Sequence, residues 1–170
     1  MSISSDIAYL SSYFSIPQGW INNVISFESS WNPLALNPVS GAMGLIQFTD
    51  STARSMGYDS AFDLVSKYPD ADSQLMGPVF DYLKGESPFS SEQDFYMSIF
   101  LPSLRSVAPD TLITGLAAEQ NVTIQTVQDY INSAQNAGEQ FLNMLTDTDS
   151  STGEIVLIAL VAAILLLLFK

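Results

Sequence analysis

The sequence contains neither cysteine nor histidine. Without cysteine, the chain has no disulfide and no thiolate nucleophile. Without histidine, Ser-His and Cys-His catalytic pairs are excluded, and the usual nitrogen ligands of zinc are missing. A catalytic site in this chain must therefore rely on other side chains, and carboxylates are the first to consider.

Basic residues are also scarce. The chain has 5 Lys and Arg residues against 18 Asp and Glu residues, which gives a net charge of −13. Binding to nucleic acid depends on neutralising phosphates with Lys and Arg, so this composition argues against a nucleic-acid partner. The acidic residues are spread along the chain instead of forming a tail, which is typical of a charge that keeps a small apolar-rich domain soluble.

One long apolar run lies near the C-terminal end of the sequence. Every residue from 155 to 169 is apolar, and Lys170 follows. At about 1.5 Å per residue the run is somewhat shorter than the roughly 30 Å hydrocarbon core of a bilayer, and residues 151–154 extend it. A buried core helix or a membrane-surface helix is the alternative, but a surface helix needs a polar face, which this run lacks. We expect residues 154–170 to form a single-pass transmembrane anchor in a lipid membrane.

Composition also indicates where the folded domain begins and ends. Residues 146–153 (TDTDSSTG) are polar and typical of a flexible tether. Residues 1–13 lack the basic region and the uninterrupted apolar core of a secretory signal, so we expect them to belong to the folded domain. The predicted organisation is a domain over residues 1–145, a tether over residues 146–153 and an anchor over residues 154–170.

Hydrophobic spacing predicts a mainly α domain. Pro17 suits the first turn of a helix that carries Ile21, Val24 and Ile25 on one face, and the residue before Pro33 ends it. A second, short helix is predicted up to Met56, with Thr49 or Asp50 as its cap. Alternation of period two is too short for a strand, but a small hairpin within residues 35–48 fits the turn residues there. Further helices are predicted over residues 61–68, 72–84, 95–104, 111–120 and 123–145.

Glu28 is the first candidate for catalysis. It lies three, four and seven residues after Ile25, Val24 and Ile21, so it shares the buried face of their helix. Burial raises the pKa of a carboxyl and keeps it protonated near neutral pH. Such a group can act as the general acid that protonates a glycosidic oxygen. The alternative is an ordinary glutamate at a helix end, with its side chain in solvent.

The residues that follow Glu28 favour the catalytic interpretation. Ser29 has a hydroxyl that can bond the carboxylate or the acetamido group of a sugar. Gly41, Gly44 and Gln47 belong to the turn GAMGLIQ. Its glycines let the backbone approach a ligand closely, and the glutamine amide offers a donor and an acceptor to a sugar. Each feature alone is weak, but their order behind Glu28 is specific.

Three segments together resemble known motifs: Glu28-Ser29, residues 40–47 (SGAMGLIQ) and residues 51–53 (STA). They are similar to the motifs of the soluble lytic transglycosylases, a family related to goose-type lysozymes. The resemblance is specific across residues 27–53, weaker across residues 71–136, and it does not extend to the apolar run. It implies a lysozyme-like, α-rich fold and cleavage of the β-1,4 bond between N-acetylmuramic acid and N-acetylglucosamine in peptidoglycan.

The resemblance also implies roles for individual residues. Glu28 would be the single catalytic residue: it protonates the leaving oxygen and then, as a base, helps the muramic 6-hydroxyl attack the anomeric carbon, which gives a 1,6-anhydro sugar. Ser29 would orient Glu28 or the acetamido group. Gln47 and the backbone near Met43 would contact substrate. In the family's Ala-Tyr-Asn motif the tyrosine has its best match in Tyr96, which would contact Glu28, although the asparagine is missing here.

Each of three aromatic residues has two possible roles, one at the substrate site and one in core packing. Tyr96 has core packing as its alternative. Trp20 and Trp31 flank the predicted catalytic helix; core packing is the commoner role of tryptophan in a small domain, and stacking on sugar rings is the alternative.

A second carboxylate would change the reaction. A retaining hydrolase of the paired type needs one about 5–5.5 Å from the acid. Asp50, Asp59 and Asp63 are available, but none stands in a recognisable motif. The transglycosylase reaction needs only Glu28, with no cofactor and no metal, so the sequence favours a lyase. A goose-type-like hydrolase, or a non-catalytic glycan-binding or structural membrane protein on the same fold, is the alternative.

The predicted order of domain, tether and anchor suggests the membrane in which the protein acts. A small enzyme without a signal peptide and with a C-terminal anchor fits the virion membrane of a membrane-containing bacteriophage. There it would open the host cell wall during infection, beside other virion membrane proteins. A bacterial inner-membrane enzyme of wall remodelling or secretion is the alternative setting.

Overall fold

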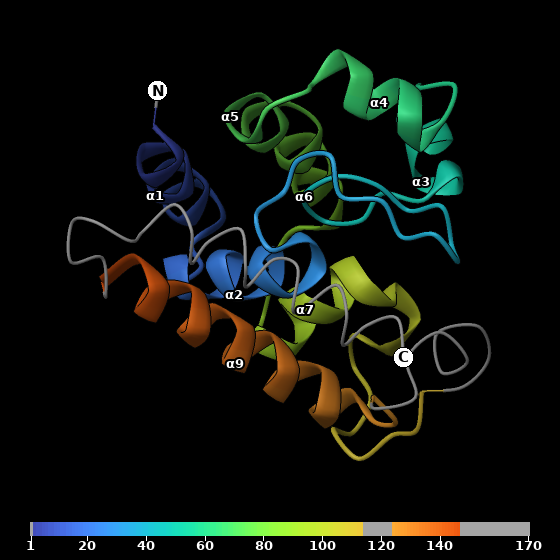
Figure 1. Ribbon diagram of the computed structural model, residues 1–170. Coiled ribbons are helices and arrows are strands. Elements are labelled where there is room, and N and C mark those ends of the chain that lie inside the picture. Colours follow the sequence, from blue (N-terminus) through green and yellow to red (C-terminus); the bar gives the residue numbers. More distant parts are fainter. Residues whose placement is uncertain (1, 114–123, 147–170) are drawn as a thin grey trace.

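Helices make up most of the structure, a computed structural model that describes residues 2–113 and 124–146 (Figure 1). Within these residues the only β pairing consists of isolated bridges, so the predicted mainly α class is confirmed. The helical elements are α1 (Ile3–Phe14), α2 (Gln18–Ser29), α3 (Asp50–Ser55), α4 (Ala61–Lys67), α5 (Ala71–Gln74), the π-helical turn η1 (Leu75–Val79), α6 (Phe80–Glu86), α7 (Glu92–Phe100), the 3₁₀ turn η2 (Pro102–Leu104) and α9 (Val127–Thr146).

Side-chain caps explain where many of these helices begin. At each such N-terminus a Ser, Thr or Asp side chain accepts a hydrogen bond from the backbone N–H three residues later, which satisfies a donor that the helix leaves unpaired. The predicted cap at Thr49 is confirmed, and the helix expected over residues 95–104 begins earlier than predicted, after a cap at Ser91. The capping residues are Ser2, Thr49, Ser60, Asp70 and Ser91.

The predicted helix over residues 72–84 is present as three consecutive pieces, α5, η1 and α6. Pro78 has no backbone N–H to donate and Gly77 departs from helical geometry, so the chain widens into a π turn there. The buried stripe continues through the irregular turn, because Leu75, Val79 and Leu83 are all inaccessible to solvent.

The structure differs from the prediction ahead of α9. Residues 111–113 were expected to be helical, but Leu112 forms an antiparallel bridge with Thr126, and the N–H of Ile113 donates to Gln125. The rest of that predicted helix lies outside the described residues. Helix α9 then begins later than residue 123, because Thr126 and Asp129 cap it: the Thr126 hydroxyl accepts from the Asp129 N–H, and the Asp129 carboxylate accepts from the Thr126 N–H.

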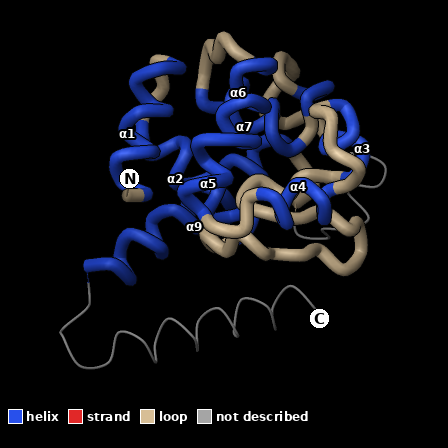
Figure 2. The backbone as a smooth tube through the Cα atoms, turned by 90° about the horizontal axis from the view of Figure 1, so that it is seen from above, coloured by secondary structure: helices blue, strands red, loops and turns tan. Residues whose placement is uncertain are grey.

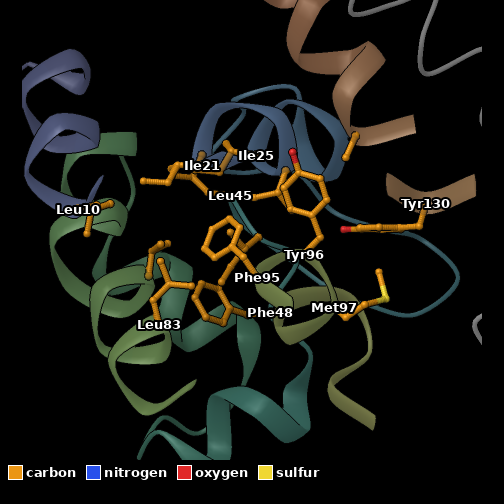
Figure 3. Packing of buried hydrophobic residues seen from close by; sticks show 14 of the residues in the cluster. Leu10, Ile21, Ile25, Leu45, Phe48, Leu83, Phe95, Tyr96, Met97 and Tyr130 are labelled. Carbon is orange, nitrogen blue, oxygen red and sulfur yellow. The ribbon is translucent and has the colours of Figure 1, made fainter. Parts of the chain in front are cut away.

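Helix α2 lies at the centre of the described fold. Helices α1, α7 and α9 all pack against it, and α9 runs along it in Figures 1 and 2. Its residues Ile21 and Ile25 join Leu45, Phe95 and Leu10 in one hydrophobic core (Figure 3). The helix that carries the candidate catalytic residue is therefore held on several sides by packing.

None of the helices in residues 2–113 and 124–146 is long and apolar enough to cross a bilayer. The predicted anchor, residues 154–170, and all but the first residue of the predicted tether lie outside the described residues.

Candidate active site

Glu28 lies in the last turn of α2, at the edge of the buried face formed by Ile21, Val24 and Ile25. The helix stops just beyond it because Ser30 adopts a left-handed conformation with φ 50°, and Trp31 follows with φ 62°. The Glu28 side chain is half-buried. Glu28 thus lies beside the buried face on which the spacing placed it, with its side chain at the boundary between core and surface.

The partner of the Glu28 carboxylate is Tyr130 of α9. The Tyr130 hydroxyl donates a hydrogen bond to Glu28 Oε1. Its fully buried ring is stacked on Phe100 with a centroid distance of 4.2 Å, and it meets the edge of Phe27 at 5.2 Å. Two aromatic neighbours therefore fix the phenol that touches Glu28.

The surroundings of Glu28 favour its protonated form. Burial raises the pKa of its carboxyl to about 7, against the Tyr130 hydrogen bond, which lowers it by stabilising the carboxylate. The C-terminal end of α2 also presents partial negative charge to this group. No Lys or Arg in the described part of the chain forms an ion pair with it. Glu28 can thus both donate and accept a proton near neutral pH.

The predicted contact between Tyr96 and Glu28 is wrong, because Tyr130 occupies that position. Tyr96 is fully buried on α7. Its hydroxyl donates to Glu92 Oε1 at 2.8 Å and accepts from Asn23 Nδ2 at 2.9 Å. Since Asn23 lies more than one turn before Glu28 on α2, the Tyr96 hydroxyl is directed to a different part of the same helix.

Ser29 is buried, and its hydroxyl donates to the carbonyl of Ile25 one turn earlier at 3.1 Å. The hydroxyl therefore bonds its own helix, which is common for serine in helices. The predicted role of Ser29 in orienting Glu28 or a sugar stays a prediction.

The glycine-glutamine turn folds as a small, tight hairpin, as the sequence suggested. Met43 exchanges two backbone hydrogen bonds with Phe48 and forms a bridge with Leu36. Gln47 has φ 56°, and its side-chain amide donates to the carbonyl of Gly44 at 3.0 Å. The Met43 backbone and the Gln47 amide donor thus hold the shape of the turn. Their predicted contacts with substrate remain predictions.

Gly44 and Gln74 form a contact that the sequence did not reveal. Gly44 has φ 83°, and a Cβ atom there would lie 2.8 Å from Gln74 Oε1, so only glycine fits. Gln74 is fully buried; its Oε1 accepts from the Leu45 N–H at 2.9 Å, and its Nε2 donates to the carbonyls of Pro33 and Tyr68. One glutamine therefore ties the turn to α5.

Both tryptophans pack against aromatic rings of the protein. Trp20 stacks on Phe95 with a centroid distance of 6.2 Å, and Trp31 stacks on Phe141 of α9 at 5.8 Å. The Trp31 indole N–H also lies within hydrogen-bond distance of Ser26 Oγ at 3.1 Å. These contacts favour the packing role over stacking on a sugar.

Two of the three possible second carboxylates are engaged elsewhere. Asp50 pairs with Arg54 and accepts from the Ala61 N–H, while Asp63 pairs with Lys67. All of these groups belong to α3 and α4 or flank them (Figure 1). Among the residues that the structure places, no group of three or more acidic side chains is arranged to hold a metal ion.

Sequence comparison with known families finds a match over part of the candidate site. Residues 7–72 match the family model of the transglycosylase SLT domain. No curated protein and no solved structure matches the chain significantly. The matched segment contains Glu28 and the glycine-glutamine turn, whereas Tyr130 lies beyond it. It covers less than half of the chain, and it supports similarity to the lytic transglycosylase family, with its lysozyme-like domain.

Proposed function

We propose that this chain is a peptidoglycan lytic transglycosylase in which Glu28 is the single catalytic residue. The observation that carries the proposal is the state of Glu28: a half-buried carboxyl at a helix end, bonded by a phenol and not by a cation, with a pKa raised by burial to about 7. This group lies within the segment that is similar to the transglycosylase SLT domain.

The reaction follows from one carboxyl that changes its protonation state. Protonated Glu28 gives its proton to the glycosidic oxygen as the bond between that oxygen and the anomeric carbon breaks. The Glu28 carboxylate then takes the proton of the muramic 6-hydroxyl as that oxygen bonds to the same carbon. Glu28 ends protonated, no water is consumed, and the product is a 1,6-anhydro sugar. The Tyr130 hydroxyl would stabilise the carboxylate between the two steps.

The arrangement of acidic residues favours this reaction over paired-carboxylate hydrolysis. Asp50 and Asp63 each pair with a basic residue of their own helix, and neither of them bonds Glu28 in the described part of the chain. We further propose that the turn with Met43 and Gln47, together with Ser29, forms the substrate-binding surface next to Glu28.

Mass spectrometry of peptidoglycan digested by the full-length chain tests the reaction. Products lighter by one water than those of a lysozyme are expected, because the muramic 6-hydroxyl replaces water. Ordinary reducing ends would identify a hydrolase. A gel containing peptidoglycan that shows no clearing, with folded protein confirmed by circular dichroism, would instead favour the non-catalytic, glycan-binding alternative.

We also propose that residues 154–170 anchor this activity in a membrane, in the virion of a membrane-containing bacteriophage that must open the host cell wall. The support is the uninterrupted apolar run. Deleting residues 153–170 is expected to move the protein from the membrane fraction to the soluble fraction. Unchanged fractionation of the shortened chain would overturn the anchor, and a bacterial inner-membrane location would place the same chemistry in another setting.

A further inference from the structure

Helix α9 approaches α2 closely at Gly138. A Cβ atom on Gly138 would lie 1.8 Å from Asn23 Oδ1 and 2.9 Å from Asn23 Cα. The second of these atoms belongs to the backbone, so a rotation of the Asn23 side chain could not relieve the contact. No side chain larger than that of glycine fits at position 138 unless α9 moves away from α2.

Specific contacts on both sides of Gly138 also hold α9 in this position. Gln135 donates to Glu92 Oε2 at 3.1 Å, and Glu92 accepts from Tyr96, which in turn accepts from Asn23. This chain of hydrogen bonds joins α9, α7 and α2. On the other side, Phe141 stacks on Trp31. The position of α9 is therefore defined by specific contacts as well as by hydrophobic packing.

The face of α9 that carries Gly138 also carries Tyr130, which contacts the candidate catalytic residue. Tyr130, Ala134 and Gly138 are four residues apart and lie on one buried face. Two small residues bring the helices together, and Tyr130 then meets Glu28 two turns before Gly138. Because a helix moves as a rigid rod over such a distance, a displacement at Gly138 also displaces the Tyr130 ring.

We propose that Gly138 is a positioning residue: its contact with Asn23 seats α9 on α2 and thereby places the Tyr130 ring over the Glu28 carboxyl. The effect on catalysis rests on the proposed function, whereas the effect on Glu28 itself does not. The titratable groups around Glu28 are Tyr130 on α9 and, behind it, Tyr96 and Glu92 on α7. The segment needed for the active site thus extends well past the region of family similarity, to α9.

The substitution Gly138→Ala in the full-length chain tests the proposal. The readout is the titration of the Glu28 carboxyl, followed by its carbon chemical shift with ¹³C-labelled glutamate. If α9 is pushed off, water reaches Glu28, so its pKa is expected to fall below the wild-type value. Activity at pH 7 should then fall with the protonated fraction of Glu28, by roughly fivefold for the first unit by which the pKa falls and by about tenfold for each further unit. An unchanged Glu28 pKa overturns the proposal, whereas a rise would mean that the Tyr130 hydroxyl has left the carboxyl without water taking its place, which is also a displaced ring.

A matched control and a milder variant complete the test. Gly85→Ala makes the same change in α6, where a Cβ atom meets nothing within 4 Å, so the Glu28 titration should not move. Gln135→Met removes the hydrogen bond to Glu92 without adding a charge and should lower the pKa of Glu28 in the same direction by less. This variant decides the question if Gly138→Ala does not fold. If the wild-type chain proves inactive on peptidoglycan, the proposed function fails. The Glu28 titration still tests whether Gly138 positions α9 on α2.

Discussion

Two places in the molecule shift the pKa of a carboxyl group in opposite directions. One is the contact between α2 and α9, with Glu28, and the other is the corner around Arg105, with Asp94. At the corner, Asp94 accepts from Arg105 Nε at 2.5 Å and from the Ser90 N–H at 2.7 Å, and Arg105 also pairs with Glu86 at 3.0 Å. The Arg105 guanidinium lowers the pKa of Asp94. At the other contact, Glu28 has only the neutral phenol of Tyr130, and burial raises its pKa.

The difference shows what decides the charge of a buried acid in this molecule. A cation beside the carboxyl outweighs the cost of burial, while a single neutral donor does not. The chain has few cations, and Arg105 is used to hold structural acids. Glu28, which has no cation beside it, lies in the region similar to the transglycosylase SLT domain. Four substitutions can break or sharpen this contrast.

The largest effect is expected from Glu28→Gln. The amide can neither give nor take the proton, so release of muropeptides from peptidoglycan should fall at least about 100-fold, while helicity by circular dichroism stays unchanged. Asp59→Asn is the matched control, because Asp59 is exposed and was a candidate second carboxylate; it should retain full activity. Substantial muropeptide release by Glu28→Gln would remove Glu28 from the mechanism.

Arg105→Met should have the largest effect on stability. It leaves Asp94 buried without its cation, which should lower the free energy of unfolding at pH 7 by about 3–5 kcal/mol in urea titrations. Because the folded-state pKa of Asp94 is lowered, Asp94 contributes to stability above pH 3.8. This contribution is lost as the pH falls through the folded-state pKa. The variant should lack this dependence. Lys67→Met, at an exposed pair, should cost far less stability, because solvent screens the pair; equal losses in the two variants would contradict the contrast.

Tyr130→Phe separates the hydrogen bond of Tyr130 from the burial that its ring provides. The ring keeps its packing on Phe100, but the carboxylate loses its donor, so the pKa of Glu28 should rise above about 7. The alkaline limb of the pH-activity profile should move to higher pH by about one to two units, since such a bond to a charged group contributes about 1.5–3 kcal/mol. Tyr9→Phe, at an exposed tyrosine of α1, is the control and should leave the limb at its original position. A limb that moves to lower pH in Tyr130→Phe would show that the bond does not favour the carboxylate.

Asp6→Asn should have the smallest effect, and of opposite sign. Asp6 is fully buried, and both of its carboxyl oxygens lack a hydrogen-bond partner among the described residues. Burial, with Asp72 nearby, raises its pKa. The folded state therefore holds this proton more tightly than the unfolded state, and stability falls as the pH rises above 3.8. The variant should gain about 1 kcal/mol at pH 7 in urea titrations and lose that dependence; a less stable variant would indicate that the charged form is favoured in the fold.

Local signals predicted the helices that carry the site. The spacing of Ile21, Val24 and Ile25 gave α2 and the place of Glu28 on it, and the cap at Thr49 gave the start of α3. The tight turn before α3 was also visible, because glycines mark it. These features depend on residues close together in the sequence, and neighbouring residues are sufficient to determine them.

The contacts that complete the site could not be predicted in the same way. Tyr130 lies 102 residues after Glu28, and only the packing of α9 on α2 brings them together. The buried stripe of α9 could have shown that Tyr130 faces inward, but not what it touches. The family motif pointed to Tyr96, whose hydroxyl bonds Asn23 and Glu92 instead. Gln74 looked like an ordinary polar residue, although it is fully buried and holds the turn.

The most direct test of the central claim is the titration of the Glu28 carboxyl in the wild-type, full-length chain, followed by its ¹³C chemical shift. Burial without a cation predicts a midpoint near pH 7, so that Glu28 is protonated in a large share of molecules at neutral pH. A midpoint near 4.5, the ordinary value for glutamate, would mean that Glu28 is charged at neutral pH and would contradict its role as the catalytic acid.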